Sequence, residues 1–421
     1  MSALETPPAA AKDPKDERIH ALEAEIEKLK QKIPLDPELI AKEARKRFLR
    51  FLVDRVNPGF MDRHRGDLTT WDREVFQEAG RLGLMGYNAP KELGGEGRSS
   101  AEWNYTLEEL GKLIEDPGFL IIAQIQKNWA QLIHSLGRQD LVDRYARPMI
   151  SGDHTLAWAM WEPADPSHMQ SVAKKVEGGW KVFAGKPLTT GGWYATLFAI
   201  VVREEETDEQ VLFLVEREDP GVQVDFLPTV GGHHVGYASL TLTDVFVPED
   251  RLLVESDALA AASRVFNDGI LNAAAVHMGW MQRIFGLCVS ALRPKVRHGQ
   301  SVLEIPHVQS ELGRLYMGIE TARSLFQRTV ERYRQSENDP LAEPLTPIFK
   351  HFLTERALDT ARTVMTLQGA TGYMDNNPWG RYLTHAFGLL HAAGSQDLIP
   401  QQQGTRMLME LEMKRLRKVG F

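Results

Sequence analysis

The sequence predicts an α+β fold with an N-terminal helical domain, a middle antiparallel β-domain and a C-terminal four-helix bundle. Apolar residues recur at helical spacing before residue 150 and after residue 254, and alternate with polar residues in between. The strands form one block and do not alternate with helices, which argues against a parallel sheet. We therefore expect four segments: a disordered tail with a short coiled-coil helix (1–34), an α-domain (35–150), a β-domain (151–254) and a helical bundle (255–421).

The composition is that of a globular protein and excludes several classes of function. The 421 residues are 43% hydrophobic and 25% charged, which is enough for two or three ordinary cores. A net charge of −8 argues against nucleic acid as the main partner. The single cysteine, Cys288, excludes a disulfide framework and fits a cytoplasmic location. We expect no membrane insertion and no secretion signal, because no long apolar stretch is present.

The first segment carries a coiled-coil pattern. Ile19, Leu22, Ile26, Leu29 and Ile33 follow each other in steps of three and four, which is the spacing of a coiled-coil seam. The alternative is a lone amphipathic helix that packs on its own subunit. Two heptads are too short to be stable alone, so the seam predicts a homo-oligomer, either a dimer or a tetramer, with further contacts elsewhere.

The expected helices and strands follow from runs of apolar residues. One helical stripe is predicted by Tyr105, Leu107, Leu110, Leu113 and Ile114. Four strands are predicted by Trp180, Val182 and Ala184, by Leu197, Ala199 and Val201, by Val211, Phe213 and Val215, and by Leu240, Leu242 and Val245. Two bundle helices are predicted by Val308, Leu312, Leu315, Ile319 and Ala322, and by Leu353, Ala357, Ala361 and Val364. The common phosphate-loop, dinucleotide, zinc and hydrolase motifs are absent, so we expect no metal site.

The stretch from Gly369 to Gln396, GATGYMDNNPWGRYLTHAFGLLHAAGSQ, resembles the C-terminal flavin and active-site segment of the acyl-CoA dehydrogenase superfamily. The matching residues are Gly369, Gly372, Tyr373, Pro378, Gly394 and Ser395. The family's catalytic Glu falls on Ala393, which retains only a backbone N–H. In the family that N–H polarises the thioester carbonyl, so the resemblance implies a carbonyl-polarising site without the usual base.

Three further runs carry the same resemblance. LGLMGYNAPKELGGEG (82–97) is similar to a family loop near the mouth of the acyl site, and AWAMWEPADPSHMQSVA (157–173) is similar to a run that holds the flavin. AGKPLTTGG (184–192) is similar to a second flavin-holding run, in which Leu188 replaces the family's Trp. The resemblance therefore implies FAD as cofactor, held by Trp161, Ser167 and Thr190 in this sequence.

The resemblance also implies that a neighbouring subunit grips the flavin dinucleotide. The ungapped count places Lys295 on the family's Arg, His298 on its Phe and Gly299 on its Gly. Lys is a point charge and cannot make the planar bidentate contact that Arg makes with phosphate. The nearby Arg293 or Arg297 could make that contact instead. The alternative for this basic cluster is a solvated helix end that is favourable against the helix dipole.

Dehydrogenation needs a carboxylate base within hydrogen-bond reach of the substrate's α-proton. Some family members carry that Glu on an earlier helix, where the count gives Gly269. Asp268 and Asp397 are the candidate relocated bases, although an Asp at either place can also serve as a helix cap or as an exposed charge.

The resemblance thus predicts an FAD-dependent oxidoreductase acting on an acyl-CoA or related acyl substrate with a non-standard or relocated base. A candidate electron acceptor is an electron-transfer flavoprotein. One alternative is a flavin monooxygenase of the same fold, which needs no α-proton base. A second alternative is a non-catalytic relative that binds acyl ligands and has weakened FAD binding.

Overall fold

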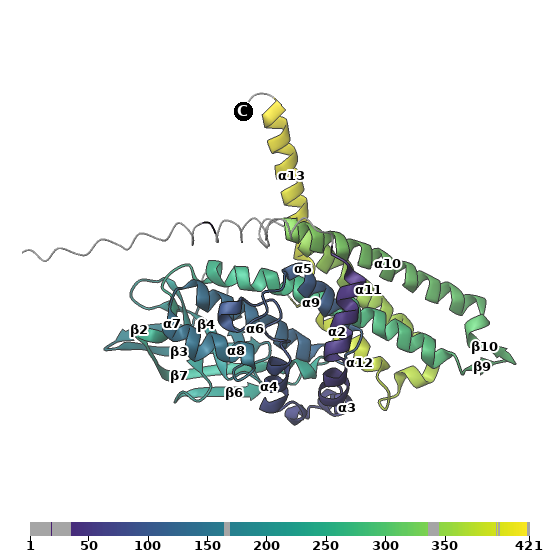
Figure 1. The fold of residues 1–421 in the computed structure, drawn as a ribbon, viewed down its shortest axis with the longest axis horizontal. Helices are drawn as coiled ribbons and strands as arrows, with labels where there is room; N and C mark the ends of the chain where they lie inside the picture. Colours follow the sequence, from purple (N-terminus) through teal and green to yellow (C-terminus); the bar gives the residue numbers. More distant parts are fainter. Residues whose placement is uncertain are drawn as a thin grey trace, which may run out of the picture.

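The computed structural model describes Arg18, residues 35–163, residues 169–335, residues 345–392, Gly394 and residues 396–418. The predicted coiled-coil seam from Ile19 to Ile33 lies outside the described residues. So do three candidate site residues, Ser167, Ala393 and Ser395. The described chain runs from helices through one sheet to a second set of helices, which confirms the predicted α+β fold (Figure 1).

The N-terminal region is helical, as predicted. Its elements are α2 (Pro37–Phe51), η1 (Leu52–Val56), α3 (Phe60–His64), η2 (Leu68–Thr70), α4 (Arg73–Arg81), η3 (Lys91–Leu93), α5 (Ser100–Gly111), α6 (Gly118–Ser135), α7 (Gln139–Leu141), η4 (Val142–Ala146) and α8 (Arg147–Ser151). Local capping fixes several starts. The Asp36 carboxylate accepts from two backbone N–H groups of α2, and Ser99 and Glu102 form a reciprocal capping box at α5.

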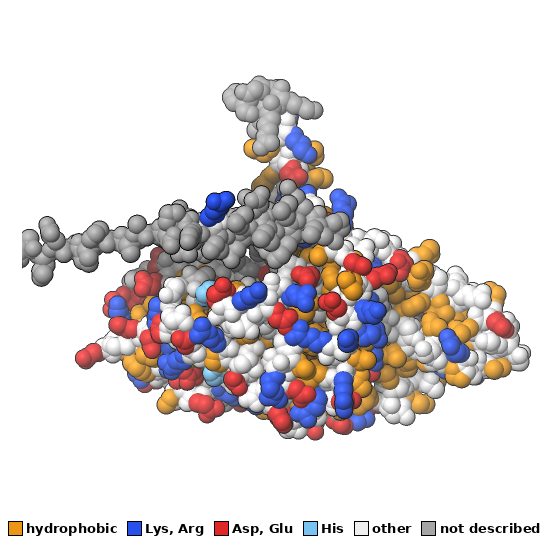
Figure 2. All heavy atoms as spheres, in the orientation of Figure 1, with side chains coloured by type: hydrophobic (Ala, Val, Ile, Leu, Met, Phe, Trp, Pro, Cys, Tyr) orange, Lys and Arg blue, Asp and Glu red, His pale blue; other side chains and the backbone are white. Residues whose placement is uncertain are grey.

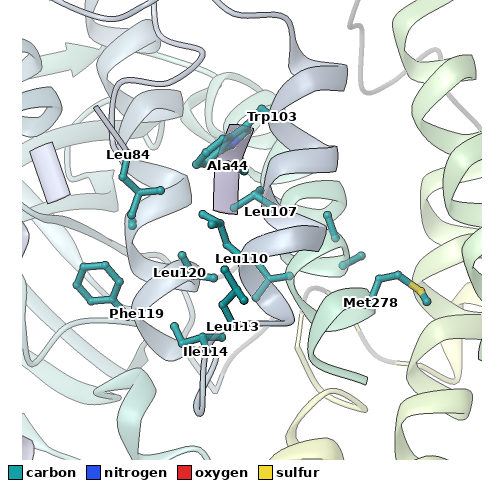
Figure 3. Packing of buried hydrophobic residues seen from close by; sticks show 14 of the residues in the cluster. Ala44, Leu84, Trp103, Leu107, Leu110, Leu113, Ile114, Phe119, Leu120 and Met278 are labelled. Carbon is teal, nitrogen blue, oxygen red and sulfur yellow. The ribbon is translucent and has the colours of Figure 1, made fainter. Parts of the chain in front are cut away.

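The predicted stripe of α5 is buried. Figure 3 shows Leu107 and Leu110 among the side chains of α2 and α6, including Ala44 and Leu120. This cluster continues onto α9 through Met278, so α5 lies at the centre of the contact between the two helical regions. Burial of such side chains contributes roughly 1.5–3 kcal/mol each.

The middle region forms one eight-stranded sheet. Its elements are β1 (Leu156–Ala159), β2 (Val172–Val176), β3 (Gly179–Thr189), β4 (Leu197–Glu204), β5 (Gln210–Glu216), β6 (Val222–Phe226), η6 (His233–Val235), β7 (Ala238–Pro248), η7 (Glu249–Arg251) and β8 (Leu252–Val254). The strand order is β6-β7-β3-β2-β4-β5-β8, and β1 pairs with β4. The four predicted strands are β3, β4, β5 and β7.

The sheet is mixed, whereas the sequence predicted an antiparallel one. β3 with β7 and β4 with β5 are antiparallel, as expected, but β1 and β2 each run parallel to β4. These two short strands were not predicted, because four or five residues give too little alternation to detect. Both faces of β4 are buried: Leu197 faces the helices with Trp129, while Phe198 faces Val182 of β3.

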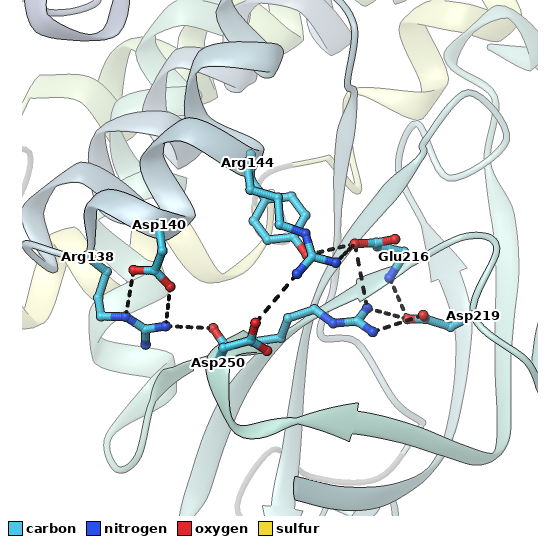
Figure 4. A network of polar contacts seen from close by, with 8 residues as sticks. Arg138, Asp140, Arg144, Glu216, Asp219 and Asp250 are labelled. Atoms are coloured by element: carbon cyan, nitrogen blue, oxygen red, sulfur yellow. Dashed lines mark hydrogen bonds and ion pairs between the residues drawn. The ribbon is translucent and has the colours of Figure 1, made fainter. Parts of the chain in front are cut away.

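A charged network joins the sheet to the N-terminal helices (Figure 4). Arg144 of η4 pairs with Glu216 at the end of β5 and with Asp250. Arg251 makes a bidentate ion pair with Asp219. The Asp219 carboxylate also accepts a hydrogen bond from the Glu216 backbone N–H. The network therefore fixes the edge of the sheet on the helical layer.

The last region is helical again. Its elements are α9 (Ala258–Leu292), β9 (Val296–Arg297), β10 (Gln300–Ser301), η8 (Val302–Glu304), α10 (Pro306–Gln335), α11 (Leu345–Leu367), η9 (Gly369–Tyr373), α12 (Trp379–Gly388) and α13 (Leu398–Lys418). Of the two predicted stripes, that of α11 is fully buried, whereas Leu312 of α10 is only partly buried. α9, α10 and α11 pack together and α12 packs on α11, while α13 projects from the body (Figure 1).

Candidate functional site

A buried ion pair organises the predicted flavin surface. The Lys186 ammonium of β3 donates to the Glu162 carboxylate and to the Met160 carbonyl, and the Gln170 backbone N–H donates to the same carboxylate. Burial lowers the pKa of Lys186, while Glu162 raises it in return. Burial raises the pKa of Glu162, but the hydrogen bonds from Lys186, Ser171 and Gln170 bring it below its usual value. The pair therefore fixes the chain after β1 against β3.

Next to this pair, two apolar side chains face solvent. Trp161, one residue from Glu162, is 50% exposed, and Leu188, two residues from Lys186, is 42% exposed. Thr190 is exposed as well, and the Thr189 hydroxyl is buried without a hydrogen-bond partner among the described residues. Exposed apolar side chains together with the exposed Thr190 fit a flavin ring, which is apolar on its faces and polar at its edge.

The predicted dinucleotide grip lies at a hairpin. Lys295 donates to the side-chain and backbone oxygens of Gln368 at 2.7 and 3.4 Å, which places its ammonium directly beside Gly369. Arg297 and His298 are exposed, and His298 and Gly299 have φ of 51° and 76°. Positive φ at both positions is what a tight two-residue turn between β9 and β10 requires. The cluster is therefore not a helix end, because α9 already stops at Leu292.

The two predicted parts of the flavin site do not meet within one chain. Figure 1 shows β9 and β10 at one end of the helical bundle and the sheet at the opposite side of the molecule. Trp161 and Thr190 lie beside β1 and β3, whereas Lys295, Arg297, His298 and Gly369 lie beside the hairpin. The residues thus fit FAD in kind, with cations for its phosphates and an apolar surface for its ring, provided that two chains supply them.

Asp268, the first candidate base, is already engaged. Its carboxylate accepts from Lys127 Nζ at 2.5 Å, from the Tyr333 hydroxyl at 2.6 Å and from Asn272 Nδ2 at 3.5 Å. Burial raises the pKa of Asp268, but Lys127, Tyr333 and Asn272 lower it below its usual value. A carboxylate in this state is a weak base whose acceptor positions are occupied.

The second candidate, Asp397, is exposed and lies directly before α13. The neighbouring loop is contacted by Lys350 of α11. The sequence did not predict this role for Lys350. Its ammonium donates to the Gly394 carbonyl at 3.1 Å and to Gln396 Oε1 at 3.2 Å. Burial lowers the pKa of Lys350 to about 8. Lys350 therefore holds Gly394 and Gln396 in place.

The contact between α6 and α9 is unexpectedly polar. We call its five side chains the polar strip; they are Gln124, Lys127 and Asn128 of α6 with Asp268 and Asn272 of α9. The sequence offered a signal for it, since the α6 residues lie at i, i+3 and i+4 on a helix whose other residues are mostly apolar. That spacing is usually typical of a solvent face, so only the structure reveals that these residues are buried.

A second buried polar cluster contains only imidazoles. His64, His234, His385 and His277 form a row with ring centroids 5.1, 4.9 and 5.2 Å apart. Burial is the main cause that lowers the pKa of each, to about 3 for His64 and about 4 for His277. The row is therefore neutral at ordinary pH. Within the described residues, no group of three or more His, Cys, Asp or Glu is arranged to hold a metal.

None of the helices that the structure describes has an apolar stretch long enough to span a bilayer. A groove of about 910 Å³ runs along α13, lined by Leu398, Gln401, Gln402, Thr405, Arg406, Met409, Glu410, Met413 and Lys414. This groove contains none of the residues that the resemblance implicates in catalysis, so size alone does not locate the chemistry.

Comparison with known proteins agrees with this fold. The chain is similar to benzylmalonyl-CoA dehydrogenase of Aromatoleum aromaticum, with 24% identity over 84% of this chain and 93% of that protein. Its fold is similar to that of butyryl-CoA dehydrogenase from Megasphaera elsdenii, with a TM-score of 0.80 and 20% identity over 89% of this chain and 99% of that chain. It is also similar to the fold of PigA with FAD and proline, with a TM-score of 0.77 and 18% identity over 90% and 99% of the two chains.

Two family models match the sequence. Residues 40–153 match the acyl-CoA dehydrogenase N-terminal domain and residues 259–408 match the acyl-CoA dehydrogenase C-terminal domain, together more than half of the chain. The sequence resemblance is thereby confirmed, and the chain belongs to the acyl-CoA dehydrogenase superfamily.

Proposed function

We propose that this protein is an FAD-dependent oxidoreductase that acts on an acyl-CoA or a related acyl thioester. The observation that carries the proposal is the exposed surface of Trp161, Leu188 and Thr190, held in place by the buried Glu162–Lys186 pair. An exposed Trp and Leu lose water favourably against a flat ring, and the Thr190 hydroxyl can hydrogen-bond to its edge. When bound there, FAD would accept the hydride that leaves the acyl chain.

The site that we propose needs two copies of the chain. Lys295 and Arg297 are the cations that would meet the phosphates of FAD, and their hairpin, β9 and β10, lies on the opposite side of the molecule from the sheet (Figure 1). Figure 2 shows hydrophobic side chains gathered on the face over α10, where Tyr316 and Met317 are exposed. α13 also exposes apolar residues, among them Leu408 and Met409. Apolar surface of this kind supports a homo-oligomer.

Proton removal is where this chain departs from its family. Ala393 cannot take a proton, and the occupied carboxylate of Asp268 argues that desaturation of a plain acyl chain is slow. Because general-base catalysis is worth about 10²–10⁴-fold, Ala393→Glu should raise desaturation if position 393 faces the α-proton. In parallel, Asp268→Asn and Asp397→Asn test the relocated base, since the change that abolishes native turnover identifies it.

The engaged state of Asp268 also favours a second candidate. A flavin monooxygenase of the same fold needs no α-proton base, so a site without a free carboxylate suits it. The two candidates differ in their use of oxygen. Substrate-dependent oxygen incorporation by the reduced protein would support the monooxygenase, whereas anaerobic bleaching of the flavin by an acyl thioester would support the dehydrogenase.

The direct test is the flavin content of the purified protein and its response to acyl-CoA under anaerobic conditions. We expect a yellow protein whose absorbance falls on addition of substrate. Lys295→Ala with Arg297→Ala should weaken FAD binding strongly, because each charged hydrogen bond contributes about 1.5–3 kcal/mol. Arg203→Ala, which breaks only a surface pair with Asp208, is the matched control. A colourless protein that takes up no FAD, or unchanged affinity in the double variant, contradicts the proposed site.

A further inference from the structure

The polar strip contains more hydrogen-bond acceptors than the described residues can satisfy. The amide oxygens of Gln124, Asn128 and Asn272 are buried and have no hydrogen-bond partner anywhere in the described part of the chain. All three side chains are less than 5% exposed. A buried acceptor left unpaired costs roughly 1–3 kcal/mol, so three together in one helix contact require an explanation.

The orientation of the three amides is fixed by their N–H₂ groups. Gln124 Nε2 donates to the Ile121 carbonyl, Asn128 Nδ2 to the Val265 carbonyl and Asn272 Nδ2 to Asp268. Turning any amide around would place its oxygen against another acceptor. Each therefore presents a carbonyl oxygen, and the strip as a whole presents acceptors.

A methyl group would fit beside the strip without a clash. A Cβ added to the buried Gly269 would meet nothing closer than Ile125 Cδ1 at 3.8 Å, Gln124 Nε2 at 3.9 Å and Asn128 Nδ2 at 4.0 Å. At the other buried crossing of α9, a Cβ on Gly279 would collide with the Glu108 carbonyl. The helices are thus less closely packed beside Gln124 and Asn128 than at Gly279.

We propose that the polar strip binds a hydrogen-bond-donating group, a hydroxyl or an amine, carried by the acyl part of the substrate. This inference rests on the proposed function, because Gly269 is the position at which the resemblance puts a substrate-facing residue. Lys127 and Asp268 neutralise each other, so the strip offers oxygens without a net charge. An unsubstituted aliphatic chain would leave all three oxygens unpaired, whereas a donor satisfies at least one of them.

Three thioesters with the same four-carbon chain test the inference on the full-length protein: butyryl-CoA, 3-hydroxybutyryl-CoA and 3-aminobutyryl-CoA. Isothermal titration calorimetry measures their binding, and loss of flavin absorbance measures turnover separately. We expect a donor-bearing thioester to bind at least about tenfold more tightly than butyryl-CoA. The two donor-bearing compounds distinguish a hydroxyl from an amine.

Two variants give the inference a signature that a structural role would not produce. Gln124→Leu should abolish the preference and raise the melting temperature of the ligand-free protein, because it removes an unpaired buried oxygen. Asn272→Leu should abolish the preference as well. The matched control is Gln126→Leu on the same helix, whose amide is fully paired with Leu156 and Ile122. This control should lower the melting temperature and keep the preference.

Equal affinity for the three thioesters overturns the inference, as does a preference that survives both site variants. A lower melting temperature in Gln124→Leu with an unchanged preference would mean that the strip holds structural water only. Absence of binding by all three thioesters also overturns it. The failure of the proposed function is distinguishable, because a protein that binds 3-hydroxybutyryl-CoA preferentially but shows no flavin reduction contradicts only the oxidoreductase assignment.

Discussion

The two buried glycines of α9 occupy opposite environments. At Gly279 the helix meets Gly111 of α5 so closely that a Cβ would strike the Glu108 backbone. At Gly269, ten positions earlier, α9 faces α6 across the polar strip and a Cβ would fit. One glycine therefore permits close packing of two helices, while the other leaves room beside unpaired oxygens. The same residue type on one helix serves the core at one end and a candidate site at the other.

The buried polar groups near Gly279 also differ from those near Gly269. Near Gly279, the imidazole of His277 lies 3.1 Å from that of His385, and both are held neutral by burial. Near Gly269, Lys127 and Asp268 are charged and paired. Neutral imidazoles can be buried in an apolar core at a modest cost. In a buried ion pair, each charge must offset the cost of removing the other from water. Four substitutions or conditions test this contrast.

The largest effect is expected at the ion pair. Asp268→Leu should cost about 3–5 kcal/mol of unfolding free energy, because it leaves the Lys127 ammonium buried without its partner. Adding Lys127→Met should recover most of that loss. Urea denaturation of the two single variants and the double variant measures the coupling. If the double variant is as unstable as Asp268→Leu alone, the pair is not the source of the loss.

The next effect is expected at the close crossing. Gly279→Ala should cost about 1–3 kcal/mol or more, because α5 must move to admit the methyl group. Thermal unfolding followed by circular dichroism measures the loss. Gly286→Ala, on the same helix with nothing within 4 Å of its added Cβ, is the control and should be neutral or slightly stabilising. Equal behaviour of the two variants would contradict the close contact.

Acid should destabilise the end that carries the histidine row. The folded-state pKa of His277 is lowered to about 4, so its stabilising contribution is present above its unfolded value of 6.5 and is lost as pH falls toward 4. Each such histidine contributes up to about 1.4 kcal/mol per pH unit in that window. Urea denaturation at pH 7 and pH 5 measures the slope, which should become shallower in His277→Gln. An unchanged slope would show that the row does not control acid stability.

The smallest effect is expected at Gly269. Gly269→Ala should be neutral or stabilise the protein by up to about 1 kcal/mol, because alanine favours the helix and its methyl group fits. The melting temperature of this variant, measured beside that of Gly279→Ala, compares the two glycines directly. A loss as large as that of Gly279→Ala would mean that α6 and α9 are packed as closely as α5 and α9.

Some residue roles can be predicted from neighbouring positions in the sequence, whereas others depend on partners far away along the chain. Gly369, Lys295 and Trp161 could be predicted as cofactor-binding residues because motif spacing is a property of neighbouring positions. Lys127 was not found, since a lysine on a helix normally faces solvent and nothing within α6 indicates that it is buried. Asp268 was recognised as a candidate base, but its engagement with Lys127 and Tyr333 depends on α6 and α10.

The sequence by itself determined the kind and order of the elements, because the period of apolar residues records which face of each helix or strand is buried. Its motifs also resembled those of the family, above all between Gly369 and Gln396. Only the tertiary structure decided that Lys127 pairs with a residue 141 positions away and that three amide oxygens meet with no partner among the described residues. The physical reason is that burial of a polar group, and the partner that offsets its cost, are set by how distant helices pack.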